Sequence, residues 1–267
     1  MKIAFIGVGT MGEAMIKGLI ADKICVAGDI SAFDIKPSRL EDTARKYGVR
    51  AAANDRDAAK GSDIVVIAVK PQDMRSLFAD LKGGIAPNAL LLSIAAGITV
   101  DSLLQGLGHR IIVRAMPNMP AQIGEGITIW TATPEVTKEQ KEAVGKLLGA
   151  LGEELYVTSE DYVDMATALS GSGPAFVFLF IEALTDAGVH IGLPRATAEK
   201  LTLKTITGSA NSVNKTGRHP AELKNMVTSP GGTTTEGLHQ LERGGFRHLI
   251  IDAVAAAYEK SKKLGKK

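Results

Sequence analysis

The sequence is poor in the residues on which several classes of protein depend. Its 267 residues include one cysteine, Cys25, one tryptophan and only 4% aromatic residues. A lone cysteine excludes an internal disulfide and favours a reducing compartment. The five histidines are dispersed, without HxxxH spacing or cysteine partners, so we predict no metal site. No Ser/His/Asp arrangement for nucleophilic catalysis is recognisable either.

An excess of one charge and long hydrophobic runs are also missing. The formal net charge is +2, and the 31 basic residues are scattered, which argues against a nucleic-acid surface. The longest uninterrupted apolar runs, such as IVVIAV, have strand length and fall short of the roughly 18 residues that a membrane helix needs. The N-terminal MKIAFIGVG is too short and glycine-broken for a signal peptide. A soluble, cytoplasmic protein is expected, with no nucleic-acid or membrane partner.

The patterned segments fall into two halves. Up to about residue 160, helical patterns alternate with short apolar runs, which predict strands at 2–7, 30–35, 63–69, 89–95, 110–116 and 126–132. Continuous Val/Ile/Leu runs joined by helices indicate a buried parallel sheet. Residues 161–267 instead have the pattern of long helices, and FVFLFIEAL is apolar nearly all round, as expected for burial between subunits. We predict a doubly wound α/β domain over 1–160 and an all-helical dimerisation domain over 161–267.

The first predicted strand runs into a glycine-rich loop. Its residues are Gly7, Val8, Gly9, Thr10, Met11 and Gly12. The G-x-G-x-x-G pattern is weak alone, since glycines are common in turns. Between a strand and a helix, however, it presents free N–H groups to a pyrophosphate. We therefore predict a Rossmann-type domain that binds a dinucleotide.

The end of the second predicted strand bears on which dinucleotide is bound. A carboxylate at Asp34 could accept hydrogen bonds from the adenosine ribose, which favours NADH. Lys36, Ser38 and Arg39 follow at once and could instead hold the 2′-phosphate of NADPH. Asp34 could also simply begin a turn. The choice between NADPH and NADH stays open.

Three further loops follow predicted strands, at the sheet edge where α/β proteins bind ligands. The residues expected to border a nicotinamide there are Val69, Lys70, Pro71, Ala96, Gly97, Pro117 and Asn118. Prolines hold the chain off the helical path and leave backbone atoms available, although Pro117 and Asn118 could simply make a turn. Arg114, within its strand, is as consistent with a structural role as with substrate binding.

Two segments of the second half carry small and hydroxyl residues at helix starts. In SGSGPAFVF, Ser172 either begins a helix with its neighbours or faces the cofactor, and the sequence favours neither reading. In SPGGTTTEGL, residues 229–238, one cap would not need three threonines. The alternative is a site where helix N–H groups and hydroxyls bind an anion.

Taken together, GVGTMG, AVKPQ, RAMPNMP, SGSGPA and VTSPGGTTTEGLHQLERGGF make the sequence resemble the pyrroline-5-carboxylate reductases over essentially its whole length. The resemblance implies NAD(P)H-dependent reduction of the cyclic imine 1-pyrroline-5-carboxylate to L-proline, the last step of proline biosynthesis. It also implies a homodimer with interlocked helical domains, often within larger rings. The residues implied to bind the substrate are Ser229, Gly231, Gly232, Thr233, Thr234 and Ser172, with Thr234 near the imine nitrogen as the catalytic group. Asp34 fits less cleanly, because many relatives prefer NADPH and lack an acid there.

Two alternatives compete with this reading. The 3-hydroxyacid dehydrogenases share the domain order but resemble one another in having a lysine on the helix after their glycine-rich interdomain segment. Here that helix has no lysine until Lys200. A non-catalytic dinucleotide sensor is the other alternative, but it would not need the SPGGTTT segment.

Overall fold

The computed structural model describes residues 1–265, so the last two residues of the expected second domain lie outside the described residues. The chain divides into two compact units. The first unit comprises Met1–Ser172 together with residues 256–265, and the second is Gly173–Ala255. Each unit has its own secondary structure and is described separately.

An eight-stranded sheet forms the centre of the first unit, with the order β3-β2-β1-β4-β5-β6-β7-β8. Its strands are β1 (Ile3–Ile6), β2 (Ile30–Phe33), β3 (Arg50–Ala51), β4 (Ile64–Ile67), β5 (Leu90–Ser93), β6 (Ile112–Met116), β7 (Gly126–Ala132) and β8 (Gly152–Tyr156). From β3 to β6 every neighbouring pair is parallel. This is the strand order of a Rossmann fold, and it confirms the predicted doubly wound α/β class.

The last two strands depart from the expected parallel sheet. β7 pairs antiparallel with β6, and β8 pairs parallel with β7. The segment Met119–Ile123 is a short 3-10 helix between β6 and β7. A parallel connection needs a crossover of about a dozen residues or more. The predicted strand at 126–132 therefore does not continue the parallel pairing of the sheet.

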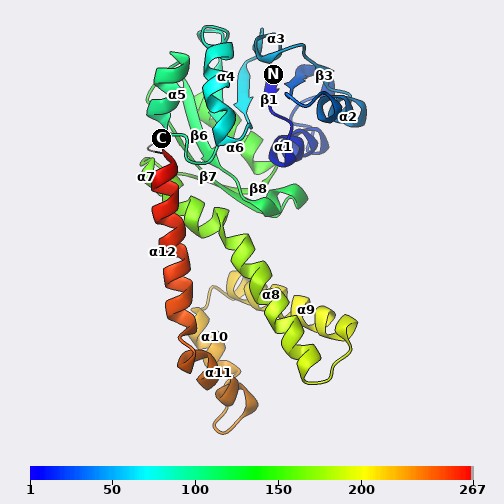
Figure 1. Cartoon of the computed structure of the whole chain (residues 1–267), viewed down its shortest axis with the longest axis vertical. Helices are drawn as coiled ribbons and strands as arrows, with labels where there is room; N and C mark the ends of the chain where they lie inside the picture. The colour runs from blue at the N-terminus through cyan, green and yellow to red at the C-terminus, as the bar shows by residue number, and fades with distance from the viewer. Residues whose placement is uncertain (266–267) are drawn as a thin grey trace. The chain divides into compact units, whose positions relative to one another are not determined.

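Helices cover both faces of the sheet (Figure 1). In the first unit they are α1 (Thr10–Ala21), α2 (Pro37–Tyr47), α3 (Asp55–Ala59), α4 (Met74–Leu81), α5 (Val100–Leu107), α6 (Lys138–Gly149) and α7 (Asp161–Ala166). Phe5 and Ile6, adjacent on β1, belong to different cores. The first core includes Leu19 of α1, and the second includes Leu77 of α4. Burial on both faces explains why the strands are continuous apolar runs.

The first unit continues beyond the expected boundary at residue 160. α7 packs against β6 and β7, and a π-helical turn, η4 (Thr167–Gly171), follows it directly. The end of α12 (Phe246–Gly265) also belongs to this unit. The boundary between the compact units thus lies at Ser172 rather than at residue 160, and the last turns of α12 belong to the first unit.

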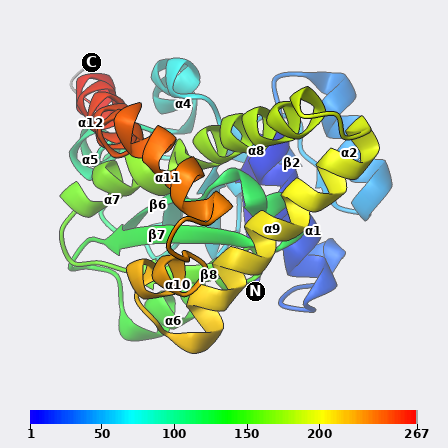
Figure 2. The same ribbon diagram turned by 90° about the horizontal axis from the view of Figure 1, so that it is seen from below.

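The second unit is entirely helical in its regular structure. It contains α8 (Gly173–His190), α9 (Arg195–Thr216), α10 (Pro220–Met226), α11 (Thr233–Arg243) and most of α12. α8 and α9 contact each other, and Figure 2 shows them meeting at the turn that joins them. A Cβ at Gly188 would lie 3.0 Å from Ala198 Cβ, so the glycine permits this close approach. The helices agree with those expected in the second half of the sequence.

One helical stretch among the described residues, Asp161–His190, is long and apolar enough to cross a membrane, judged by length and composition only. Its mean hydropathy is 1.4, and 6% of its apolar window is buried. This stretch is not an uninterrupted apolar run, because it consists of α7, η4 and α8 in succession. It was therefore not predicted from the sequence. A core helix of a soluble protein can pass the same test of length and composition.

Candidate active site

The carboxyl ends of several strands in the first unit border a cavity of about 610 Å³. The expected cofactor residues that line it are Gly7, Gly9, Thr10, Met11, Asp34, Lys36, Val69, Lys70, Pro71 and Pro117. These residues follow β1, β2, β4 and β6, which bring loops distant in sequence to one edge. This is the edge where open α/β sheets bind ligands.

The glycine-rich loop has the backbone that a bound pyrophosphate requires. Gly7 has a φ of +93°, and a Cβ there would lie 2.8 Å from Ala68 O. A Cβ at Gly12 would lie 2.4 Å from Gly7 O. Gly9 precedes α1 without a side-chain cap, so the first N–H groups of the helix have no capping acceptor. This cradle fits the phosphates of a dinucleotide, because a helix start with free N–H groups attracts anions.

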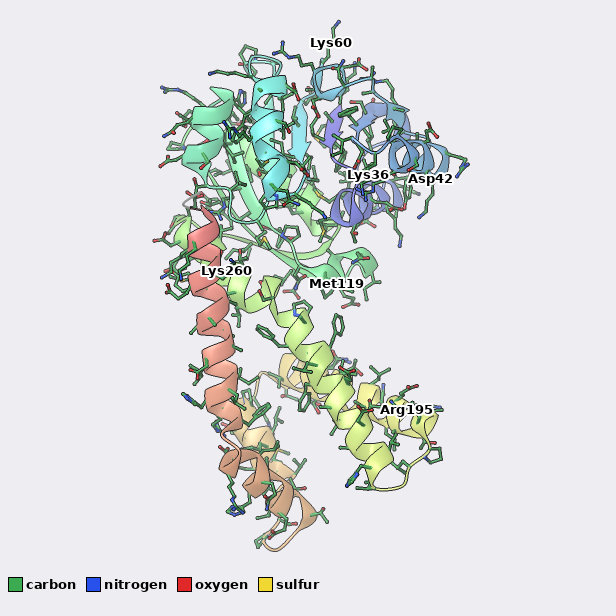
Figure 3. The ribbon with its side chains drawn as sticks, in the orientation of Figure 1. Lys36, Asp42, Lys60, Met119, Arg195 and Lys260 are labelled. Atoms are coloured by element: carbon green, nitrogen blue, oxygen red, sulfur yellow. The ribbon has the colours of Figure 1, made fainter. Side chains whose placement is uncertain are left out.

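Asp34 is buried beside this loop, and its carboxylate is bonded within the protein. Oδ2 accepts a hydrogen bond from Val8 N–H at 3.0 Å, and Oδ1 accepts one from Lys36 N–H at 2.9 Å. Arg39 Nη1 lies 3.4 Å from Oδ2. Lys36, which is labelled in Figure 3, precedes α2, and both basic residues line the cavity. Asp34 thus braces the loop, and Lys36 and Arg39 add two basic side chains to the cavity beside it.

Some expected cofactor residues do not line the cavity. Val8 is fully buried and acts through its N–H, and Gly12 lies under the loop against Gly7. Ala96 and Gly97 form the turn before α5, and Asn118 Oδ1 accepts a hydrogen bond from Ile127 N–H at 3.0 Å. The side-chain carbonyl of Asn118 therefore supports the start of β7.

Two carboxylates that were not expected also line the cavity. Asp55 begins α3, and Asp80 lies on α4. Burial and, to a smaller extent, the neighbouring Asp80 carboxylate raise the pKa of Asp55 to about 6. Met116, at the end of β6, is a further unexpected lining residue. Asp55 lies at this edge because it follows β3, a strand of only two residues. A strand so short has no apolar pattern, so the sequence did not predict it.

Ser172 follows the π-helical turn at the end of the first unit. Its N–H donates to Thr167 O at 2.9 Å, and its hydroxyl donates to the same carbonyl at 3.1 Å. π-helical turns are rare and occur frequently at functional sites. Ser172 therefore follows a π-helical turn and does not lie at an ordinary helix start. Its side chain is partly buried.

The SPGGTTT segment lies in the second unit, at the start of α11. Gly232 precedes the helix, no side chain caps it, and Gly231 has a φ of +68°. A Cβ at Gly232 would lie 2.4 Å from Ser229 Oγ, so only glycine leaves that hydroxyl in its place. The hydroxyl of Thr235 donates to Ser229 O at 2.6 Å and closes the loop. A helix start with free N–H groups and a nearby serine hydroxyl has the chemistry to bind a carboxylate.

The described residues contain no group of three or more His, Cys, Asp and Glu side chains that could hold a metal ion. The candidate residues fall into two separate groups, a glycine-rich loop with the form of a dinucleotide cradle in the first unit and an uncapped helix start in the second. A Rossmann sheet with such a cradle, together with a separate small-anion site, defines the class of dinucleotide-dependent oxidoreductases.

Comparison with known proteins narrows this class. Residues 160–264 match the family model for pyrroline-5-carboxylate reductase dimerisation, and residues 2–97 match that for NADP oxidoreductase, coenzyme F420-dependent. The pyrroline-5-carboxylate reductase of Synechocystis sp. is 42% identical over 100% of this chain and 99% of its own.

Two solved structures extend the likeness to the fold. The Coxiella burnetii pyrroline-5-carboxylate reductase has a TM-score of 0.91 and 38% identity, covering 100% of this chain and 99% of its own. The Plasmodium falciparum pyrroline carboxylate reductase, solved with NADP bound, has a TM-score of 0.89 and 34% identity, covering 99% and 98%. This chain belongs to the pyrroline-5-carboxylate reductase family.

Proposed function

We propose that this chain reduces 1-pyrroline-5-carboxylate to L-proline, with NADPH or NADH as the reductant, as the last step of proline biosynthesis. The observation that carries the proposal is the presence, in one member of this family, of both a glycine-rich loop suited to a dinucleotide and the uncapped start of α11. When bound, the reduced nicotinamide would supply a hydride to the imine carbon, which is C2 of 1-pyrroline-5-carboxylate and becomes C5 of proline, and the ring nitrogen gains a proton.

The cofactor is held by the first unit in this proposal. N–H groups of the glycine-rich loop bind the pyrophosphate, and Lys36 and Arg39 neutralise a 2′-phosphate when NADPH is used. Val69–Pro71 and Pro117 border the nicotinamide. Ala96, Gly97 and Asn118 shape its surroundings through the backbone turns that they form.

The substrate is held by residues that offer hydrogen bonds without a cation. N–H groups of Thr233 and Thr234 and the Ser229 hydroxyl bind the carboxylate, and Gly231 and Gly232 shape that loop. The Thr234 hydroxyl stands near the imine nitrogen as the catalytic donor, and Ser172 contributes to the substrate site. A protonated imine already attracts hydride, so positioning and a modest proton donor suffice for reduction.

The protein is proposed to work in the cytoplasm as a homodimer or as a ring of such dimers. Residues 1–160 and 161–267 are the proposed functional domains, the first for the cofactor and the second for the substrate and for dimerisation. The partly exposed apolar side chains of the second unit, including Leu179 and Ile251, would be covered in the dimer.

A paired spectrophotometric assay tests the function. We expect the purified protein to oxidise NADPH or NADH when pyrroline-5-carboxylate is supplied. With either oxidised cofactor it should leave 3-hydroxyisobutyrate unchanged, because α8 carries no lysine for alcohol oxidation. Turnover of the hydroxyacid alone would overturn the assignment. Cofactor binding without any turnover would instead identify a sensor.

A further inference from the structure

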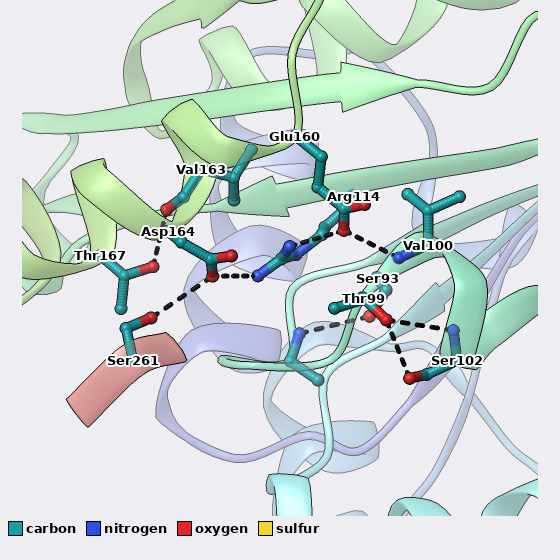
Figure 4. Close-up of polar contacts among 11 residues, drawn as sticks. Ser93, Thr99, Val100, Ser102, Arg114, Glu160, Val163, Asp164, Thr167 and Ser261 are labelled. Carbon is teal, nitrogen blue, oxygen red and sulfur yellow. Dashed lines mark hydrogen bonds and ion pairs between the residues drawn. The ribbon is translucent and has the colours of Figure 1, made fainter. Parts of the chain in front are cut away.

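A buried arginine in the first unit joins segments that are far apart in the sequence. Arg114 lies on β6 with its side chain 2% exposed. Nη1 lies 2.5 Å from Glu160 Oε1, and Nη2 lies 2.6 Å from Asp164 Oδ1 (Figure 4). Replacing a buried ion pair by apolar residues is often neutral for stability, so stability alone does not account for this arrangement.

The two carboxylates extend the network to other elements. Glu160 Oε1 also accepts a hydrogen bond from Val100 N–H, at the start of α5, at 2.8 Å. Asp164 Oδ1 accepts one from the buried Ser261 hydroxyl at 3.3 Å, on the last turns of α12. One guanidinium therefore fixes β6, α7, the start of α5 and the end of α12 relative to one another.

The same strand and helix meet again at the edge of the cavity. Met116, two residues after Arg114, lines the cavity at the end of β6. A Cβ at Gly171, in η4, would lie 3.1 Å from Met116 Cε, so the π-helical turn packs tightly on this residue. The turn leads directly to Ser172. Arg114 thus anchors, at the base of α7, a segment whose other end contacts the cavity wall.

We propose that Arg114 is a positioning residue for imine reduction. Through Glu160 and Asp164 it holds α7 and η4 against the end of β6, and this sets the place of Ser172 beside the Met116 wall. A loosened network would leave the phosphate-binding part of the cofactor site intact, because the glycine-rich loop and Asp34 follow β1 and β2, whereas Arg114 and its two carboxylates lie on β6 and at α7. It would displace Ser172 and the backbone around it. The inference rests on the proposed function, since imine reduction is the reaction measured.

Kinetic coupling between the network and Ser172 tests the proposal. Asp164→Asn keeps the shape of the side chain but removes its charge, and Ser172→Ala removes the hydroxyl. We expect each to lower kcat/KM for pyrroline-5-carboxylate by on the order of tenfold, through misplacement of the reacting groups. The double variant should lose little more than the worse single variant, because both act on one element. The Kd for NADPH, measured by fluorescence titration, should change less than about twofold in all three, an outcome a general loss of folding would not produce.

Two further variants separate positioning from stability. Arg114→Lys keeps the charge and should recover part of kcat/KM relative to Arg114→Met, because a lysine reaches one carboxylate but not both. Arg50→Met removes an exposed ion pair with Asp57 in the same unit and should leave kcat/KM unchanged. Additive losses in the double variant, or a raised Kd for NADPH in step with the loss of kcat/KM, would overturn the inference. No pyrroline-5-carboxylate reduction by the wild type would instead overturn the proposed function.

Discussion

Asp34 braces the glycine-rich loop, and in our proposal its charge also disfavours a 2′-phosphate. Its replacement separates the two effects. Asp34→Ser removes a negative charge near the proposed 2′-phosphate, where Lys36 and Arg39 remain. We expect the ratio of kcat/KM for NADPH to that for NADH to rise by about one to two orders of magnitude, if roughly 1.4 to 2.7 kcal/mol is at stake. Initial rates with the two cofactors in parallel measure the ratio.

Asp34→Ser also removes the acceptor of the hydrogen bond from Val8 N–H. Asp34→Ser should also lower kcat/KM for NADH, because the glycine-rich loop loses its brace. Arg39→Gln is the matched control and should move the ratio toward NADH. An unchanged ratio in Asp34→Ser would mean that the carboxylate only braces the loop.

Asp55 gives the fold a defined dependence on pH. Its pKa is raised from an ordinary 3.8 to about 6, first by burial and then by Asp80. The folded state therefore holds this proton more tightly than the unfolded chain, and stability is lost as pH rises from about 4 through about 6. Asp55→Asn should raise Tm at pH 7.5 by about 1 to 3 °C, because the partly exposed carboxylate costs no more than about 1 kcal/mol. At pH 4 the two proteins should melt alike.

Asp57, two residues further along α3, provides a control of opposite sign. A hydrogen bond from Ala53 N–H, together with Arg50, lowers the pKa of Asp57 below its ordinary value. Asp57→Asn should therefore lower Tm at pH 7.5. Calorimetry of both variants at the two pH values checks the pair. A lower Tm at pH 7.5 in Asp55→Asn would contradict the assigned cause.

Among the elements, the start of α11 is the one that we propose binds the substrate carboxylate. Thr234→Ala removes one hydroxyl but keeps the N–H groups. We expect a loss of roughly 10- to 150-fold in kcat/KM, which corresponds to about 1.5 to 3 kcal/mol for a hydrogen bond to a charged group. Thr234→Pro should lose more, because it deletes an N–H and reshapes the helix entry. Rates with pyrroline-5-carboxylate and with 1-pyrroline, which lacks the carboxylate, measure the effect.

The comparison of substrates separates carboxylate binding from helix capping. The wild type should strongly prefer pyrroline-5-carboxylate, and both Thr234 variants should narrow that preference. Thr216→Ala is the control, because it removes a hydroxyl from the far end of α9 and should leave the preference unchanged. Equal rates on the two substrates in the wild type would mean that the SPGGTTT segment is an ordinary helix start and does not bind the carboxylate.

The elements differ in how far the sequence could predict them. The central strands could be predicted from their long apolar runs, because a strand that is buried on both faces needs such residues. β3 is two exposed residues and β8 is the largely exposed GEELY, so neither has an apolar pattern. Because β3 escaped detection, Asp55 could not be placed at the sheet edge. The π-helical turn escaped as well, since a change in hydrogen-bond partner leaves no mark on composition.

The whole molecule is expected to be at least a dimer. Leu179 on α8 is 66% exposed and Ile251 on α12 is 65% exposed within the single chain, and both lie in the region that matches the dimerisation model. Replacing both by Glu would bury two unpaired charges in a dimer interface. We expect the Kd of the dimer to rise by at least roughly a hundredfold. Sedimentation velocity over a range of concentrations measures this.

An equally exposed residue outside that region provides the control for dimerisation. Val26, in the first unit, is 67% exposed, and Val26→Glu should leave the dimer intact. A wild type that sediments as an active monomer of about 28 kDa would contradict the proposed assembly.

In the proposed reaction a hydride passes from the bound nicotinamide to the ring carbon of the imine. The most direct measurement supplies pyrroline-5-carboxylate with NADPH or NADH deuterated at the transferable position of the nicotinamide, and analyses the product by mass spectrometry and NMR. We expect L-proline heavier by one deuterium, with the label on C5 of proline. Unlabelled proline, or cofactor oxidation without proline, would contradict it.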